Sequence, residues 1–161
     1  MPFFSKSCLR AIEKECVYCD FFNHEGNRIN TTMAEKEKYE MEYLLKTSIK
    51  VLDNMISTPS GLSEWFADDV NIKDDIYTFI WDGGEEEARL LSKKSNAKVK
   101  WQWIEDEEDD LNTYFEMKYD VDPMTKAVIL TVTDFAEPSE KDEASRLWDQ
   151  QITTLKRLLG A

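Results

Sequence analysis

Histidine and cysteine are scarce in this chain, and both are confined to its first part. The only histidine is His24, and the last of the three cysteines is Cys19. Serine and cysteine nucleophiles ordinarily depend on a neighbouring histidine base, and non-haem iron and Rieske centres depend on histidine ligands. The residues after His24 therefore exclude histidine-based acid–base catalysis and both kinds of iron site.

Long apolar runs and phosphate-binding glycine loops are also missing. No stretch of about 18 apolar residues occurs, so the sequence predicts no transmembrane helix and no membrane insertion. The opening MPFFSKSCLR lacks the apolar core of a secretory signal, so we expect a cytoplasmic protein. Gly83 and Gly84 are followed by three glutamates, which would repel phosphate, so this pair predicts a turn.

Positive charge is in short supply. The chain has 33 Asp and Glu residues against 20 Lys and Arg residues, which gives a net charge of −13 at pH 7. Such a field repels a phosphate backbone and an anionic membrane surface, so we expect no nucleic-acid partner. The simplest role of the charge is to keep the protein in solution.

Residues 1–32 differ in composition from the rest of the chain. They hold every cysteine and the only histidine, and they balance four acidic residues with four basic ones, so the whole net charge belongs to residues 33–161. We expect residues 1–32 to be an N-terminal extension that is disordered or weakly helical. Met33 is then expected to be the natural start of the protein, with residues 1–32 an extension upstream of it. A short helical appendage over Arg10–Tyr18 is an alternative.

A zinc site is the other interpretation of this N-terminal part. Cys16 and Cys19, with His24 beyond them, have the opening spacing of a zinc knuckle, and Cys8 is a candidate fourth ligand. The spacing from Cys8 to Cys16 is unusual, however, and the cysteine expected after the histidine is missing. The metal interpretation is therefore disfavoured, and no cofactor is predicted.

Strands dominate the main domain. Tyr39, Met41 and Tyr43 alternate with charged residues, which is typical of a strand with one buried face. The strand from 127 to 135 is apolar on both faces and is expected near the centre of a sheet. The predicted strands are Lys38–Leu44, Val70–Lys73, Ile76–Trp81, Glu87–Ser92, Lys98–Ile104, Thr113–Tyr119 and Ala127–Phe135.

The acidic run Glu105–Asp110 lies between two of these strands. Carboxylate oxygens are ligands for hard cations, but the run lacks the alternating ligand spacing and the glycine of an EF-hand loop. We therefore expect a solvated hairpin loop here.

Three helices are expected. Thr47 and Ser48 offer N-caps for a helix with apolar residues at helical spacing from 49 to 56, which Pro59 ends. A second short helix covers Leu62–Phe66. A long C-terminal helix follows, with Ser139 and Asp142 as a capping-box-like pair and Gly160 at the C′ position. Its apolar stripe comprises Leu147, Trp148, Ile152, Leu155, Leu158 and Leu159.

This order of elements predicts an α+β fold of the helix-grip type. Successive strands joined by tight turns pair antiparallel. One amphipathic helix cannot cover a flat seven-stranded sheet, so we expect a curved sheet around the C-terminal helix, with two short helices after the first strand and a cavity at the mouth. Over residues 36–161, the order resembles that of the START-like (helix-grip, SRPBCC-type) superfamily.

Two local patterns strengthen the resemblance. The stretch Ile49–Phe66, with Pro59, Leu62 and a terminal Trp–Phe pair, resembles the first helices of activators of heat-shock-protein-ninety ATPase. The stretch Leu147–Gly160 resembles the gripping helix of that group. The chain is most similar to a bacterial START-like family related to these activators. The superfamily includes lipid carriers, cyclases, hormone receptors and chaperone activators, so the resemblance implies a fold more than a function.

Aromatic and methionine side chains are the main candidates for a ligand site. They predict a pocket for an apolar ligand, with an ordinary dry core as the alternative. Arg89 belongs to the set if it points inward, although an outward, solvated arginine is favoured. The candidates are Met41, Tyr43, Met55, Trp65, Phe66, Phe79, Trp81, Arg89, Trp101, Trp103, Phe115, Met117 and Trp148.

Our leading hypothesis is a non-enzymatic module that holds a small hydrophobic molecule between the sheet and the C-terminal helix. The alternative is a protein-interaction module like the chaperone ATPase activators. An enzyme of the cyclase or hydrolase kind is less favoured, because it would need a buried carboxylate such as Asp134 or Glu116 as acid or base. No oligomeric state is predicted.

Overall fold

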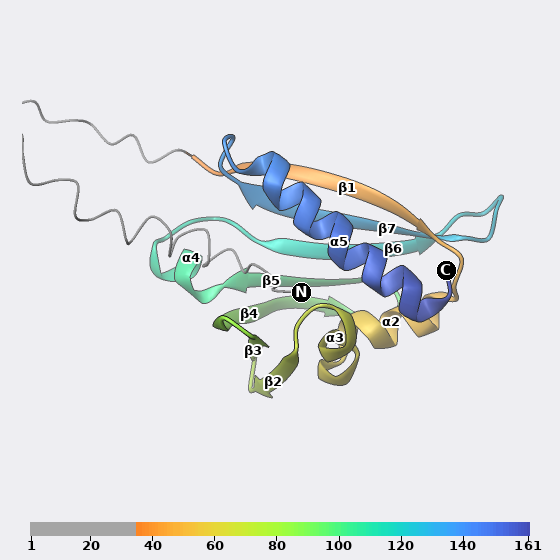
Figure 1. Ribbon diagram of the computed structural model, residues 1–161, viewed down its shortest axis with the longest axis horizontal. Helices are drawn as coiled ribbons and strands as arrows, with labels where there is room; N and C mark the ends of the chain where they lie inside the picture. The colour runs from red at the N-terminus through yellow and green to blue at the C-terminus, as the bar shows by residue number, and fades with distance from the viewer. Residues whose placement is uncertain (1–34) are drawn as a thin grey trace, which may run out of the picture.

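A computed structural model describes residues 35–161 (Figure 1). The expectations for residues 1–32, including the zinc interpretation of Cys8, Cys16, Cys19 and His24, lie outside the described residues. The elements are β1 (Glu37–Leu45), α2 (Ile49–Ser57), α3 (Pro59–Trp65), β2 (Asp69–Lys73), β3 (Ile76–Trp81), β4 (Gly84–Lys94), β5 (Lys98–Trp103), α4 (Ile104–Glu108), β6 (Phe115–Val121), β7 (Val128–Ala136) and α5 (Lys141–Leu159).

The seven strands form one antiparallel sheet in the order β1-β7-β6-β5-β4-β3-β2. Strands β2 to β7 are sequential neighbours, and β3 passes to β4 through a tight turn in which Trp81 faces Gly84. The first strand pairs with the last one, so β1 and β2 are the two edges of the sheet. A register shift between Leu90 and Ser92 in β4 marks a bulge, which bends a strand.

One face of this sheet forms the core, and the helices cover it. Figure 1 shows α5 lying across the sheet, with α2 and α3 beside its C-terminal half. Alternate residues of β6, namely Phe115, Met117 and Tyr119, are buried on this face. Leu130 and Val132 of β7 stand next to them in register. The seven-stranded helix-grip arrangement predicted from the sequence is therefore confirmed.

Helix α5 buries one stripe of side chains at helical spacing, formed by Ala144, Trp148, Ile152 and Leu155. Gly160 ends the helix with a left-handed φ of 64°, as predicted, and its N–H donates to the last turn. Leu158 was wrongly assigned to the stripe, because its side chain is 48% exposed. At about 100° per residue it lies roughly 80° around the helix from Trp148.

Two predicted helix starts are wrong. The N-cap of α5 is Glu140 and makes no side-chain cap hydrogen bond, so Ser139 and Asp142 do not form a capping box. Helix α3 begins at Pro59 and not at Leu62. Thr58 caps it by accepting a hydrogen bond from the Gly61 N–H at 3.0 Å, and a proline at N1 has no N–H that needs a partner.

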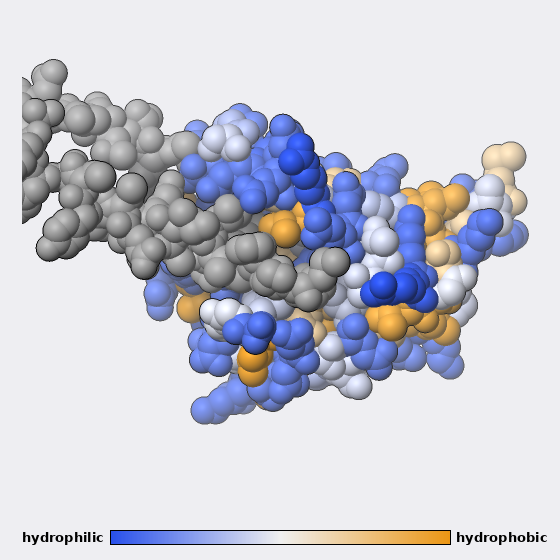
Figure 2. All heavy atoms as spheres, viewed as in Figure 1, coloured by the Kyte–Doolittle hydropathy of each residue, from blue (hydrophilic) through white to orange (hydrophobic). Residues whose placement is uncertain are grey.

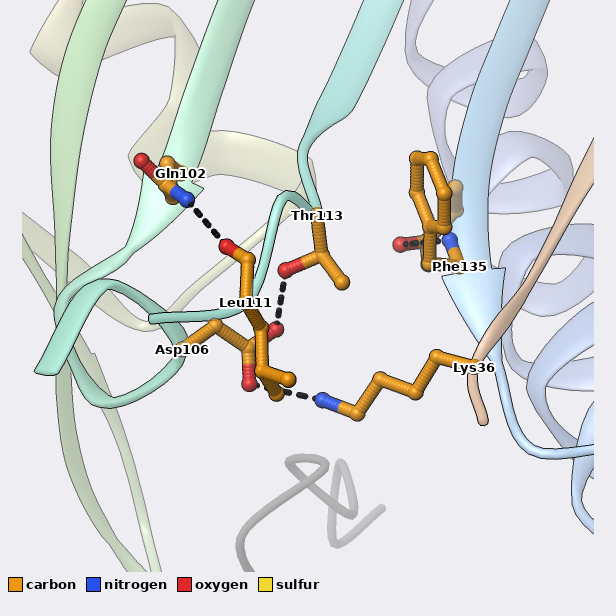
Figure 3. A network of polar contacts seen from close by, with 7 residues as sticks. Lys36, Gln102, Asp106, Leu111, Thr113 and Phe135 are labelled. Atoms are coloured by element: carbon orange, nitrogen blue, oxygen red, sulfur yellow. Dashed lines mark hydrogen bonds and ion pairs between the residues drawn. The ribbon is translucent and has the colours of Figure 1, made fainter. Parts of the chain in front are cut away.

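The acidic run is the third correction, because its first part is helical. Helix α4 follows β5 directly, and Asp106 within it is buried. The Asp106 carboxylate accepts hydrogen bonds from Lys36 Nζ at 2.6 Å and from the Thr113 hydroxyl at 2.5 Å (Figure 3). Gln102 of β5 donates to the Leu111 carbonyl at 2.8 Å. These contacts fix the segment between β5 and β6 to the start of β1, so it is not a solvated loop.

The position of β7 differs from the expectation as well. It lies next to the edge strand β1 and not at the centre of the sheet. Its apolar residues are explained by α5 on the core face and by a half-buried opposite face, where Thr133 is buried and Phe135 packs against Tyr114 with ring centroids 5.0 Å apart. An apolar strand thus needs cover on both faces, not a central place.

The outer surface on the side of α5 is largely hydrophilic, with separate apolar patches toward the end where α5 finishes (Figure 2). Met124, between β6 and β7, is the most exposed large apolar side chain of the described residues, at 91%. No helix in residues 35–161 is long and apolar enough to cross a membrane.

Candidate functional site

A continuous cluster of aromatic rings lies between the helices and strands β3, β5 and β6. Phe115 stacks on Trp101 and on Trp103, with ring centroids 5.1 Å and 4.7 Å apart. Phe79 meets the same two indoles edge to face, at 6.5 Å and 5.8 Å. These rings share one face of the sheet because residues two apart in a strand point the same way.

Phe66 joins this cluster to the helices. It caps the C-terminal end of α3. Its ring lies 5.0 Å from Phe79, 6.2 Å from Phe115 and 5.8 Å from Trp148 of α5. Helix α5 itself lies closest to β1, β7 and α3. The rings therefore occupy the part of the interior between α5 and the half of the sheet that contains β3, β5 and β6.

A buried carboxylate stands at the edge of the ring cluster. Asp134 of β7 is 2% exposed. Its Oδ2 accepts hydrogen bonds from Trp148 Nε1 at 2.8 Å and from the Tyr39 hydroxyl at 3.2 Å, and its Oδ1 accepts one from the Phe135 N–H at 2.7 Å. Burial, and then the negative charge of Asp134, raise the pKa of Tyr39 far above its usual range. This group ties α5 to both β7 and β1.

The five indole N–H groups fall into two sets. Trp65 donates to the Met55 carbonyl and Trp81 to the Phe66 carbonyl, both at 2.9 Å, and Trp148 donates to Asp134. The buried N–H groups of Trp101 and Trp103 have no hydrogen-bond partner within residues 35–161. Buried donors without a partner are uncommon in native proteins.

Most of the predicted site residues come together in this interior. Met41, Tyr43 and Met55 pack against the core from its margin and are partly buried. Those within the core are Trp65, Phe66, Phe79, Trp81, Trp101, Phe115, Met117 and Trp148, with Trp103 partly buried against them.

Arg89 is the exception among the predicted site residues. Its side chain is 43% exposed, and its Nε pairs with the Glu107 carboxylate of α4 at 3.0 Å. Neighbouring Ala88 points into the core, so Arg89 faces the other way. Within residues 35–161, no group of three or more His, Cys, Asp or Glu side chains is arranged to hold a metal ion.

Sequence reasoning missed the central role of Asp134 and did not include Tyr39. The signal was available, because Asp134 has the same parity as the buried Leu130 and Val132 and so had to face the core. Tyr39 stands opposite Asp134 in the register of β1 and β7. That pairing joins segments far apart in the sequence and could not be derived from local patterns.

An antiparallel sheet with one long C-terminal helix across its core face defines the helix-grip class of α+β domains. A family model described as the START-like superfamily domain matches residues 33–161, so the chain belongs to the START-like superfamily. Among the curated proteins, none matches the chain.

Solved structures share this fold. BfR322 from Bacteroides fragilis is 34% identical, with 77% of this chain and 91% of that chain covered and a TM-score of 0.56. The Aha1 dimer from Colwellia psychrerythraea is 16% identical, with 76% and 96% covered and a TM-score of 0.66. MLL2253 from Mesorhizobium loti is also 16% identical, with 77% and 97% covered and a TM-score of 0.62. The last two similarities concern the fold alone.

Proposed function

We propose that the domain binds a small apolar molecule between the sheet and α5. The ring cluster that bridges the two layers carries the proposal, because aromatic faces are the surfaces on which a planar apolar molecule stacks. Phe66 and Trp148 are the rings on the helix side, and Phe79, Trp101 and Phe115 are those on the sheet side. A bound molecule would separate these two sets and take over their ring contacts.

Native mass spectrometry of the purified full chain, followed by denaturing extraction, tests this function. We expect a complex heavier than the chain by the mass of one small molecule, and an apolar compound in the extract. A Phe115→Ala protein that folds but copurifies with nothing would place the compound on the ring cluster. A wild-type chain that stays bare, even after incubation with apolar extracts, would contradict the proposal.

A second candidate is a protein-interaction module. It is favoured by the fold shared with Aha1, an activator of Hsp90 ATPase, and by the net charge of −13, which suits a basic partner surface. Stimulation of an Hsp90 ATPase by this chain that weakens steeply with added salt would support it. No stimulation at low salt would remove it.

A further inference from the structure

Two neighbouring tryptophans of β5 hold indole N–H groups that are buried without an acceptor. Trp101 is 0% exposed, and neither its Nε1 nor that of Trp103 has a hydrogen-bond partner in the described part of the chain. The other three tryptophans each donate to an oxygen at 2.8–2.9 Å. Leaving a buried donor unpaired costs free energy, and a bound acceptor would remove that cost.

Both donors belong to the proposed ligand site. Trp101 and Trp103 are two residues apart on one strand, so their side chains leave the same face about 7 Å apart. Both indoles stack on the ring of Phe115. The N–H of an indole lies in the plane of its ring, and both indoles meet Phe79 edge to face. A molecule that takes the place of Phe79 would therefore come within reach of an indole N–H group. The ring cluster would supply the apolar contacts, and the indoles would supply polar recognition.

The charge nearby limits the kind of acceptor. Glu116 and Thr133 are partners in the register of β6 and β7, so Phe115 and Asp134 occupy neighbouring positions on the core face. Asp134 is a buried carboxylate that accepts hydrogen bonds from Tyr39, Phe135 and Trp148. A second carboxylate brought beside it would meet a like charge in a poorly solvated place. A neutral carbonyl or ether oxygen avoids that repulsion.

We propose that the ligand is a neutral, planar apolar molecule that carries a carbonyl or ether oxygen, and that this oxygen accepts a hydrogen bond from Trp101 or Trp103. This inference rests on the proposed function and specifies its ligand class. The proposed class excludes pure hydrocarbons, which have no acceptor oxygen, and fatty-acid anions, which carry a negative charge.

A matched pair of probes tests the acceptor. Acetylnaphthalene and ethylnaphthalene have nearly the same shape, but only the ketone has an acceptor oxygen. Both are titrated into the full chain, isotope-labelled at the indole nitrogens, with tryptophan fluorescence as the measure of affinity. We expect the ketone to bind about tenfold more tightly, the factor typical of one buried hydrogen bond. We also expect at least one of the Trp101 and Trp103 indole N–H resonances to move downfield with the ketone alone.

Phenylalanine variants supply the matched controls. Trp101→Phe and Trp103→Phe keep a ring and remove the unpaired donor, so the double variant should lose the preference for the ketone. Trp65→Phe removes an indole N–H that already donates to the Met55 carbonyl, and it should keep the preference. If the double variant does not fold, the Trp101 and Trp103 indole N–H resonances of the wild-type protein still show whether the ketone accepts a hydrogen bond from either group.

The outcomes separate the two claims. Equal affinity for the two probes, or an unchanged preference in the double variant, would overturn the acceptor inference and leave the proposed function standing. The two N–H groups would then be explained by weak contacts with ring faces such as that of Phe79. Failure of both probes to bind up to their solubility limits would overturn the inference and the proposed function together.

Discussion

Asp134 is a carboxylate buried among aromatic rings, and its hydrogen bonds make that position tolerable. Its oxygens accept from the indole of Trp148, the hydroxyl of Tyr39 and the backbone N–H of Phe135. A buried charge without such partners would cost several kcal/mol. Because the donors come from α5, β1 and β7, a single side chain holds the long helix in register with two strands.

Replacing Asp134 with Asn should lower the free energy of unfolding by about 2 kcal/mol. The amide keeps one acceptor oxygen but turns an NH₂ group toward a donor, and hydrogen bonds to charged groups contribute about 1.5–3 kcal/mol. Asp149→Asn is the control, because Asp149 is exposed and its carboxylate accepts a hydrogen bond from the Tyr43 hydroxyl at 2.7 Å. Urea unfolding measures both, and equal losses would contradict the role of Asp134.

The tyrosines predict how stability depends on alkaline pH. Burial, with a neighbouring carboxylate, raises the pKa values of Tyr39, Tyr43 and Tyr119 above the usual value of about 10. Above that pH the unfolded chain releases the tyrosine hydroxyl protons while the folded chain keeps them. The stability that these tyrosines contribute is therefore fully present below about pH 10, and it falls as the pH rises further. Tyr39→Phe should make the fall shallower by up to about 1.4 kcal/mol per pH unit. A parallel pH profile for the variant would refute this.

Single residues of the site were partly predictable from sequence. The rings were identified because aromatic residues at alternate strand positions face one side. Which indoles lack an acceptor was not predictable. The acceptors of Trp65 and Trp81 are the backbone carbonyls of Met55 and Phe66, and their positions depend on how α2 and α3 pack.

At the scale of elements, α5 is held by its buried stripe. Trp148 combines a 5% exposed ring with the hydrogen bond to Asp134. Trp148→Ala should therefore cost about 3–5 kcal/mol of unfolding free energy, by cavity formation and loss of that hydrogen bond. Leu158→Ala on the same helix removes a half-exposed side chain and should change stability by less than about 0.5 kcal/mol. Thermal unfolding of the two variants compares them, and a fully stable Trp148→Ala protein would contradict this packing.

Helices α2 and α3 meet at a glycine. A Cβ at Gly61 would lie 2.3 Å from the Asn54 carbonyl oxygen and 2.6 Å from the Met55 Cα, both backbone atoms. Gly61→Ala should therefore destabilise the fold by about 1–3 kcal/mol, because the two helices must move apart. Ser60→Ala, at the exposed neighbouring position, is the control. Circular dichroism melting follows both, and equal melting temperatures would show that the helices separate without cost.

Strands were easier to predict than helix ends. Every strand was predicted to within a few residues. Alternation located strands such as β1 and β5, since burial of one face imposes a period of two, and the apolar run over 127–135 located β7. Helix α4 was missed because its residues, IEDEE, show no amphipathic pattern. Its buried residue is Asp106, which is buried with Lys36 and Thr113 as partners. The start of α5 was misplaced because its N-cap, Glu140, makes no side-chain hydrogen bond that a capping pattern would indicate.

At the scale of the whole molecule, only part of the strand order in the sheet could be predicted from the sequence. Short connections imply that successive strands from β2 to β5, and β6 with β7, are neighbours. Strands β5 and β6 are also adjacent, although α4 lies between them in the chain. The pairing of β1 with β7 joins the two ends of the domain, from Glu37 with Ala136 to Leu45 with Val128. It was not predicted, because the two strands lie far apart along the chain. The pairing of β1 with β7 places Tyr39 beside Asp134, which also accepts from Trp148 of α5, so the site depends on both ends of the domain.

The most direct test of a ligand between the sheet and α5 is an NMR measurement on the full chain with acetylnaphthalene bound. Intermolecular nuclear Overhauser effects report which side chains lie next to the probe. We predict contacts from the probe to Phe79 and Phe115 on the sheet side and to Trp148 on α5. Contacts only with exposed side chains such as Val51 and Leu158 would contradict the account, because the ring cluster would then be a dry core.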